Sequence, residues 1–237
     1  MTDAISVSLT RQSGLLQELS VIANNIANAS TDGFRREAAV FAEFVRELPE
    51  QASASMGSLR GHYTDLSTGT MRKTGGALDL AIEGAGWFGV GRDGDVLLTR
   101  AGHFMLDNEG NLVTPMGDPV LDEGGAPVTL PPNTSEISVG PDGTITADGF
   151  GVAQIGVLSA EAEDLVRAGD NLWRTTGALR FEDTPRVRQG FLESSNVSPV
   201  EEMARLIETQ RLYEAGAALQ TDEHERIQAL IEALGRN

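Results

Sequence analysis

The stretch that decides the fold is MARLIETQRLYEAGAALQTDEHERIQALIEAL, residues 203–234, close to the end of the chain. Its seam positions are separated alternately by three and four residues throughout. They are Met203, Leu206, Gln210, Tyr213, Ala217, Gln220, His224, Ile227, Ile231 and Leu234. A repeat that averages 3.5 residues keeps one side of an α-helix turned toward a neighbouring helix. Because Ser198 suits the N-cap and Pro199 the first helical position, the pattern predicts one long helix from about Ser198.

The beginning of the chain carries the same pattern, which predicts a helix from about Asp3 to Asn28. Its seam is Ile5, Leu9, Gln12, Leu16, Leu19, Ala23 and Ile26, and Leu15 and Ile22 widen it. The run from Ser30 to Gly33 is expected to end this helix. Two such helices cannot bury their seams alone, so we expect them to pack on each other and on neighbouring subunits. The predicted assembly interface is Ile5, Leu9, Leu16, Leu19, Ile22, Ile26, Met203, Leu206, Tyr213, Ile227, Ile231 and Leu234. Gly216 is expected to lie outside this seam.

Between the two helices, residues 77–190 have the pattern of short strands joined by tight turns. Asp93-Gly94, Asn108-Glu109-Gly110 and Asp142-Gly143 are each followed by alternating polar and apolar residues. Asx and Gly at such positions supply the positive φ that hairpin turns need. Several short strands at this spacing predict an antiparallel barrel or sandwich.

The segment that joins the first helix to the strands is harder to interpret. Phe34, Ala38, Phe41 and Val45 have the spacing of a short helix, whereas residues 49–58 are typical of a flexible arm. The prediction is an α+β fold with a mainly β core, in which the β domain is inserted between terminal helices that form a coiled-coil-like α domain. Its parts are an N-terminal helix (1–33), an arm (34–76), a β core (77–190) and a C-terminal helix (191–237).

Charge and composition exclude several classes of function. The 237 residues include 35 acidic and 18 basic side chains, for a net charge of −17. Such a surface repels nucleic acid and anionic membranes, so neither is an expected partner. There is no cysteine, and no run approaches the ~18 apolar residues of a membrane span. The first six residues lack a basic region followed by an apolar run, so no cleaved leader is expected.

No pattern of catalytic or metal-ligating residues stands out. The three histidines, His62, His103 and His224, are scattered and lack the spacing of metal ligands. The run from Asp107 to Asn111 is better explained as a hairpin turn than as a calcium loop, because it lacks the terminal bidentate Glu. We therefore predict no catalytic residue, cofactor or metal. Two other classes stay open: a calcium- or sugar-binding β module with helical oligomerisation ends, and a hydrolase that uses His103.

Three motifs together resemble those of a known family. They are SGL (13–15) with VIANNIANASTDGF (21–34), LDLAIEGAGWF (78–88) with TRAGHF (99–104), and QGFLESSNV (189–197) leading into the last helix. In this order they are similar to the motifs of the bacterial flagellar basal-body rod and hook proteins. Arg35 departs from the Lys that is usual in that family. The arm at 57–76 lacks the Pro-x-Gly-x-Gln-x-Gly-x-Gly run of distal rod proteins, so the chain looks most like the proximal ones.

The resemblance implies a structural protein of the bacterial flagellum rather than an enzyme. It implies export by the flagellar type III apparatus without a cleaved leader. It also implies a place in the rod that crosses the periplasm and transmits motor torque. The implied partners are other rod proteins and further copies of the same chain. The terminal helices would pack around the rod axis, and the β domain would make lateral contacts.

Overall fold

The computed structural model describes residues 2–48, 51–132, 134–182 and 184–234. It divides into two compact units. The helical unit consists of Met1–Ala29, Arg36–Asp65 and Val197–Asn237, and the β unit of Ser30–Arg35 and Leu66–Asn196. The predicted mixture of two helices with mostly strands is confirmed.

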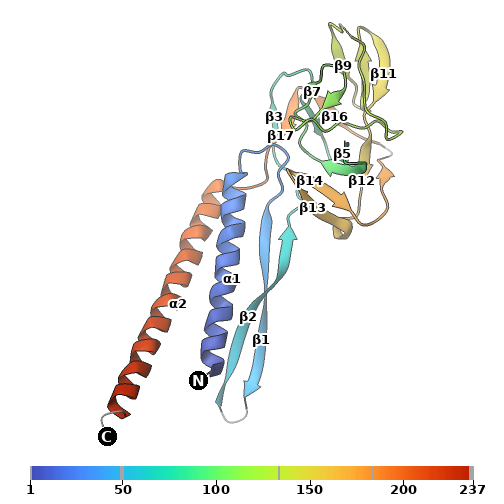
Figure 1. The fold of residues 1–237 in the computed structure, drawn as a ribbon. Helices are drawn as coiled ribbons and strands as arrows, with labels where there is room; N and C mark the ends of the chain where they lie inside the picture. The colour runs from blue at the N-terminus through green and yellow to red at the C-terminus, as the bar shows by residue number, and fades with distance from the viewer. Residues whose placement is uncertain (1, 49–50, 133, 183, 235–237) are drawn as a thin grey trace. The chain divides into compact units, whose positions relative to one another are not determined.

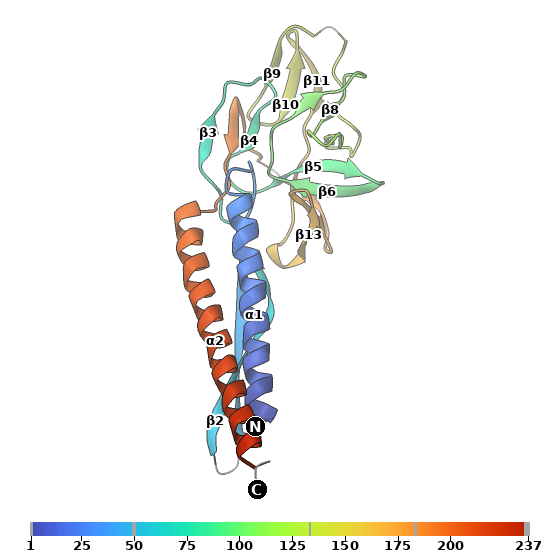
Figure 2. The same cartoon turned by 60° about the vertical axis from the view of Figure 1, so that its left-hand side comes forward.

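The helical unit contains both predicted helices, α1 (Thr2–Ala27) and α2 (Pro199–Leu234). They lie side by side in both views of the ribbon and are in contact (Figures 1 and 2). The first helical hydrogen bond of α2 runs from the amide of Glu202 to the carbonyl of Ser198 at 3.0 Å, so the helix begins where Ser198 and Pro199 predict. Among the described residues, no helix is both long enough and apolar enough to span a bilayer.

The helical unit also contains a long β-hairpin that the sequence pattern missed. Strands β1 (Glu37–Leu48) and β2 (Gln51–Thr64) pair antiparallel, and both contact α1 (Figures 1 and 2). The prediction of a short helix over 34–45 is therefore wrong. The segment is rich in β-branched and aromatic residues, and pairing with a distant strand along α1 overrides its local helical spacing.

The β unit consists of strands and one 3₁₀ turn. The strands are β3 (Met71–Lys73), β4 (Leu80–Ile82), β5 (Trp87–Arg92), β6 (Asp95–Thr99), β7 (Met105–Leu106), β8 (Leu112–Val113), β9 (Ile137–Val139), β10 (Thr144–Ala147), β11 (Phe150–Gln154), β12 (Val157–Ser159), β13 (Leu165–Gly169), β14 (Leu172–Thr175), β15 (Arg180–Phe181), β16 (Val187–Gln189) and β17 (Phe191–Glu193), and the turn is η1 (Ala162–Asp164). The largest sheet has the order β13-β14-β6-β5-β12-β15, and β11-β10-β9 forms a second sheet. The described strands form open sheets rather than a closed barrel, and the sandwich stays a prediction.

The Asx-Gly turns lie where the sequence predicts them. Asp93 and Gly94 have φ values of 55° and 86° and join β5 to β6, a geometry that L side chains other than Asn and Asp rarely adopt. The amides of Glu109 and Asn111 donate to the carboxylate of Asp107, both at 2.8 Å, which closes the turn between β7 and β8. The carboxylate of Asp107 therefore stabilises this turn.

The core of the β unit is aliphatic with a few aromatic pairs. The rings of Phe88 and Phe104 meet edge to face at 5.2 Å, and those of Trp87 and Trp173 lie 5.8 Å apart. Around the phenylalanines lie Leu80, Ile82, Val90, Leu97, Leu112, Val120, Val128, Leu130, Val139, Ile145, Ile155, Val157, Leu172 and Val187. Burial of this apolar surface is the main source of stability for the β unit.

Candidate assembly interface

Within the helical unit, each helix buries one face. On α1 the buried side chains include Leu15, Val21, Ile22 and Asn25. On α2 the buried and half-buried positions follow one another at steps of four and three. They are Glu202, Leu206, Thr209, Tyr213, Gly216 and Gln220, with Ala217 also half-buried beside Gly216. Four of these seven positions, Leu206, Tyr213, Ala217 and Gln220, belong to the predicted seam.

The residues of the predicted assembly interface fall into three groups. Leu9, Leu16 and Met203 are 54%, 50% and 55% exposed, so they contribute little to the inside of the unit. Ile22 is buried, and Leu19, Ile26, Leu206 and Tyr213 are half-buried. The side chains of Ile5, Ile227, Ile231 and Leu234 lie outside the part that the structure describes. Only part of the predicted interface therefore packs within the helical unit. The exposed side chains of Leu9, Leu16 and Met203 are accessible to another chain.

The inward face of α2 is shifted from the predicted seam by one position at two places. Glu202 and Thr209 are buried, whereas Met203 and Gln210 at the neighbouring positions are exposed. Further along, Gly216 and the seam residue Ala217 are both half-buried. The prediction that Gly216 lies outside the seam is wrong, because a Cβ built there would be 3.7 Å from Nε2 of Gln12 on α1. At this distance a Cβ would make an ordinary van der Waals contact, so Gly216 faces Gln12 without the approach requiring glycine.

A buried polar cluster joins α1, β1 and α2 near one end of the helical unit. The amide group of Asn25 accepts a hydrogen bond from the backbone N–H of Glu37 at 2.9 Å and donates to its carbonyl at 2.7 Å. It also donates to the carboxylate of Glu202 at 3.1 Å. The other oxygen of Glu202 accepts from Nε of Arg36 at 2.6 Å. Asn25 and Glu202 are 0% and 1% exposed, so this cluster specifies how the three elements align.

The sequence held only a weak signal for this cluster. Asn25 and Glu202 are 177 residues apart and lie beside the predicted seam rather than in it. A polar residue at the edge of a predicted apolar face was the clue, since buried polar groups need partners.

The two helices also bring acidic side chains together. Burial, and secondly the nearby carboxylate of Glu208, raise the pKa of Glu18 above its usual value. A raised folded-state pKa means that the folded chain pays a penalty for ionising Glu18. The penalty is present above that pKa and disappears as the pH falls below the unfolded-state value.

We expect Glu18→Gln to raise the thermal unfolding midpoint at pH 7, because it removes an ionised, half-buried carboxylate beside Glu208. The gain should shrink as the pH falls through the raised pKa, where Glu18 becomes neutral in the folded chain. Thermal melts of the full chain at pH 7 and pH 4 check this. Glu225→Gln, on an exposed position of α2, is the control and should change little. A variant less stable than the parent at pH 7 would show that Glu18 is held by favourable contacts instead.

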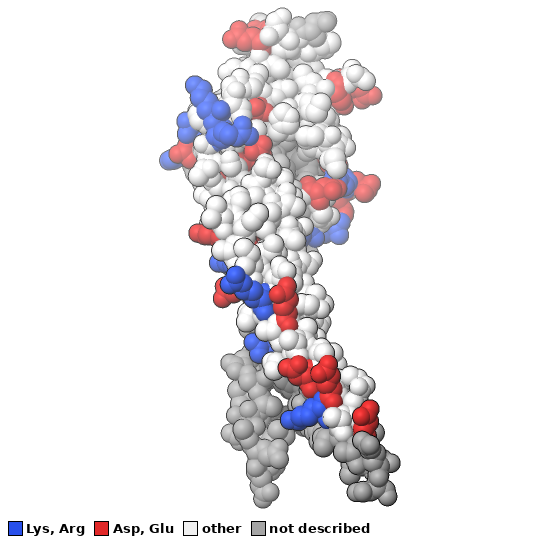
Figure 3. All heavy atoms as spheres, turned by 90° about the vertical axis from the view of Figure 1, so that its left-hand side faces the viewer, with Lys and Arg blue, Asp and Glu red and all other residues white. Residues whose placement is uncertain are grey.

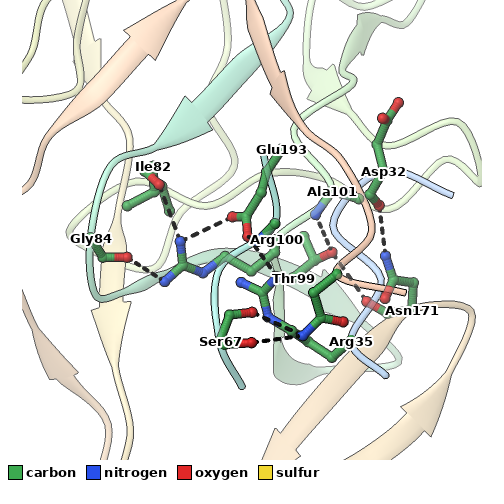
Figure 4. Close-up of polar contacts among 12 residues, drawn as sticks. Asp32, Arg35, Ser67, Ile82, Gly84, Thr99, Arg100, Ala101, Asn171 and Glu193 are labelled. Atoms are coloured by element: carbon green, nitrogen blue, oxygen red, sulfur yellow. Dashed lines mark hydrogen bonds and ion pairs between the residues drawn. The ribbon is translucent and has the colours of Figure 1, made fainter. Parts of the chain in front are cut away.

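The β unit holds a second buried cluster, which contains three charged groups (Figure 4). The carboxylate of Glu193 on β17 lies 2.5 Å from Nη1 of Arg35 and 3.2 Å from Nη1 of Arg100. All three side chains are at most 5% exposed. Burial lowers the pKa of Arg100 to about 10, so it is still charged at neutral pH. The cluster therefore carries two positive charges and one negative charge.

Other contacts orient the two arginines. Arg100 donates to the carbonyls of Ile82 at 3.2 Å and Gly84 at 2.7 Å (Figure 4). Arg35 and Arg100 also lie 5.9 Å and 5.4 Å from the centre of the Trp87 ring, within cation–π range. The aromatic face attracts part of the excess positive charge. In the sequence, Arg35 stands out only as a departure from Lys. In the structure its guanidinium lies beside both the carboxylate of Glu193 and the ring of Trp87.

The segment Ser30–Arg35, which follows α1, is held firmly within the β unit. The amide of Gly33 donates to the carbonyl of Glu193 at 2.6 Å, and Asn171 donates to the carbonyl of Asp32 at 2.9 Å. Gly33 has a φ of 71°, and a Cβ there would lie 2.4 Å from the backbone nitrogen of Ala101. Only glycine satisfies both conditions. The motif that ends the first helix is thus an anchor for the β unit.

The histidines have ordinary surroundings where the structure describes them. Nδ1 of His103 lies 2.6 Å from Asp79, with the imidazole more than half exposed, and Nε2 of His224 lies 2.9 Å from the amide of Gln228. Within the described ranges, no group of three or more potential ligands could hold a metal ion.

Comparison with known proteins identifies the family. Residues 5–35 match the family described as flagella basal body rod protein, and residues 81–147 match the flagellar hook protein FlgE/F/G D1 domain. Residues 188–233 match the flagellar basal body rod FlgEFG protein C-terminal family. The flagellar basal-body rod protein FlgF of Caulobacter vibrioides is 38% identical, over 100% of this chain and 99% of its own. The chain belongs to the flagellar basal-body rod protein family.

Two further relatives give the same result for this rod protein. FlgF of Rhizobium meliloti is 36% identical over 99% of both chains. FlgG of Bacillus subtilis is 32% identical over 90% of this chain and 92% of its own. The rod protein is therefore a structural component of the flagellar basal body and is FlgF-like along its whole length. The family is a structural one and implies assembly with other rod and hook proteins.

Proposed function

We propose that this rod protein assembles into the rod through its two terminal helices, which form a coiled-coil-like α domain. The observation that carries the proposal is the set of large apolar side chains that the helical unit leaves exposed. They are Leu9, Leu16, Val200, Met203, Ile207, Leu212 and Leu219. A helix that is apolar on its inner face and keeps so many apolar residues on other faces is suited to more than one neighbour.

The magnitude of apolar burial suits a part that carries load. An exposed ion pair contributes about 0.2–1 kcal/mol, whereas apolar burial contributes about 25 cal/mol per Å² removed from water. Leu9 and Met203 are half exposed in the single chain. Burying their side chains against a neighbour would add to the free energy of assembly. The proposed interface is Ile5, Leu9, Leu16, Leu19, Ile22, Ile26, Met203, Leu206, Tyr213, Ile227, Ile231 and Leu234.

The remaining features of the proposal follow from this role. The chain is a proximal rod subunit that transmits torque across the periplasm, next to copies of itself and other rod proteins. It is exported by the flagellar type III apparatus without a cleaved leader. The N-terminal helix (1–33) and C-terminal helix (191–237) serve axial packing, the arm (34–76) supports them, and the β core (77–190) makes lateral contacts.

The test places a charge on the exposed part of the proposed interface. We expect the double variant Leu16→Asp, Met203→Asp to fold normally, since both side chains are half exposed in the single chain. In the rod, each carboxylate would be buried against a neighbour without a partner, which costs several kcal/mol. Swimming and recovery of the chain in isolated basal bodies should therefore both be lost. Circular dichroism of the purified full chain checks the fold.

Gln17→Glu, Gln228→Glu is the matched control, because it adds the same two negative charges, one on each helix, at exposed positions outside the predicted seam. It should be incorporated at close to the normal level. If the two double variants are incorporated equally well, the exposed apolar side chains of α1 and α2 do not form the assembly contact.

A further inference from the structure

Lys73 is the only lysine in the chain, against 17 arginines. It lies at the end of β3, and its side chain is exposed. Its strand partner is Phe191, the first residue of β17. The guanidinium carbon of Arg188, on the preceding strand β16, lies 4.1 Å from the centre of the Phe191 ring. Lys73, Phe191 and Arg188 therefore lie together on one surface of the β unit.

Arg186 extends this surface. It is exposed and directly precedes β16, and its carbonyl accepts a hydrogen bond from the amide of Glu83 at 2.7 Å. Because the extended pairing continues through Arg186, its side chain and that of Arg188, two residues later, point to the same side. We call Lys73, Arg186, Arg188 and Phe191 the basic stripe. Figure 3 shows Lys and Arg side chains gathered on the β unit.

The charges of the basic stripe are poorly neutralised. Arg188 and Glu83 approach to 3.9 Å with both side chains about half exposed, which is a weak contact. Lys73 and Arg186 have no ion-pair partner in the part of the chain that the structure describes. By contrast, Arg92 is bonded to Asp118 at 2.6 Å and to Asp170 at 2.8 Å. Stacking on Phe191 holds the guanidinium of Arg188 in place and leaves its edge available to a carboxylate.

The strongly acidic charge of the whole chain bears on contacts between copies. The net charge is −17, so two copies repel each other unless a local patch of opposite sign offsets the repulsion. Unpaired carboxylates are present on the β unit itself. Glu161 and Glu163, beside and within η1, are exposed and have no ion-pair partner within the described ranges. The stripe and such carboxylates are complementary.

We propose that the basic stripe binds carboxylates on the β unit of a second copy of this chain and so forms a lateral contact in the rod. The inference rests on the proposed assembly function and adds a contact that the terminal helices do not provide. Electrostatic complementarity of this kind selects the orientation of the neighbour, while the apolar helices supply most of the affinity.

The single lysine makes a sharp test possible. A water-soluble carbodiimide joins an amine to a carboxylate in direct contact with it, forming an amide with loss of one water and no spacer. We expect treatment of isolated basal bodies to give a covalent dimer of this chain. Mass spectrometry should find Lys73 joined to an Asp or Glu within residues 66–196 of the other copy. Lys73→Arg keeps the charge but removes the side-chain amine, so motility should be kept and this dimer lost.

Three results would overturn the proposal. Lys73 could be coupled to a different protein, coupled only within its own chain, or not coupled while other amines in the basal body are. Each would show that no carboxylate of a second copy lies against the stripe.

Charge reversal gives an independent measurement. Lys73→Glu, Arg186→Glu should lower incorporation into basal bodies by about tenfold or more, because like charges then face each other across the contact. The unfolding midpoint of the free chain should stay within a degree or two, since neither side chain has a partner. Arg174→Glu, Arg180→Glu makes the same change in net charge on β14 and β15 and is the control. If both double variants are incorporated equally while the helix variants fail, the stripe has no role and the helical assembly proposal stands.

Discussion

Glu193→Gln is expected to destabilise the β unit by about 3–5 kcal/mol, which is the usual effect of removing one partner from a buried ion pair. The change keeps the shape of the side chain but leaves Arg35 and Arg100 charged and buried together, at 0% and 5% exposure. It also weakens the acceptor for the backbone N–H of Gly69, which lies 2.9 Å from Oε1 of Glu193. Denaturant unfolding of the full chain, followed by tryptophan fluorescence, measures the loss. Trp87 and Trp173 are both buried in the β unit.

The control is Glu83→Gln, which removes the same charge from an exposed carboxylate 3.9 Å from Arg188. Its effect should stay within about 0.5 kcal/mol. A second variant separates charge from packing. Arg35→Met, Arg100→Met, Glu193→Leu removes all three charges, and we expect it to recover much of the lost stability. If Glu193→Gln unfolds at the same denaturant concentration as the parent, the three charges do not form one cluster.

Asn25→Asp is expected to cost the helical unit about 3 kcal/mol or more, because a second carboxylate then faces Glu202 at a buried site. The two side chains differ by a single atom type, so packing is preserved. The change removes the donor that now reaches the carbonyl of Glu37 at 2.7 Å and the carboxylate of Glu202 at 3.1 Å. Far-ultraviolet circular dichroism during thermal unfolding follows α1 and α2 directly. Swimming should be lost as well, since the two helices would no longer be held in register.

The neighbouring residue provides the control for this change. Asn24→Asp makes the same substitution one position earlier, on an exposed side of α1. It places a negative charge near the end of a helix, which costs only about 0.3–1 kcal/mol. Equal effects of the two substitutions would mean that the helix end responds to charge in general and that the Asn25–Glu202 contact is unimportant.

Local rules in the sequence determined the helices and the turns. The spacing from Met203 to Leu234 predicts α2 because a 3.5-residue repeat is a property of one helix, visible without any partner. The turn at Asp93-Gly94 is equally local, since positive φ depends on those two residues alone. The Gly33 motif is also visible in the sequence, although its contact with Ala101 is not.

The tertiary structure alone decided which surfaces face inward and which charges meet. The apolar spacing on α1 is compatible with burial of either Leu15 or Leu16. Leu15 is the buried one because α1 packs against α2 and the β1–β2 hairpin. The same hairpin overrode the helical spacing of 34–45, because its energy comes from pairing with residues that no local window contains. Glu193 gathers Arg35 and Arg100 from two other segments, and the carboxylate of Glu202 meets Asn25 across 177 residues. A buried charge needs its partner in space, and distance along the chain carries no information about which residue that partner is.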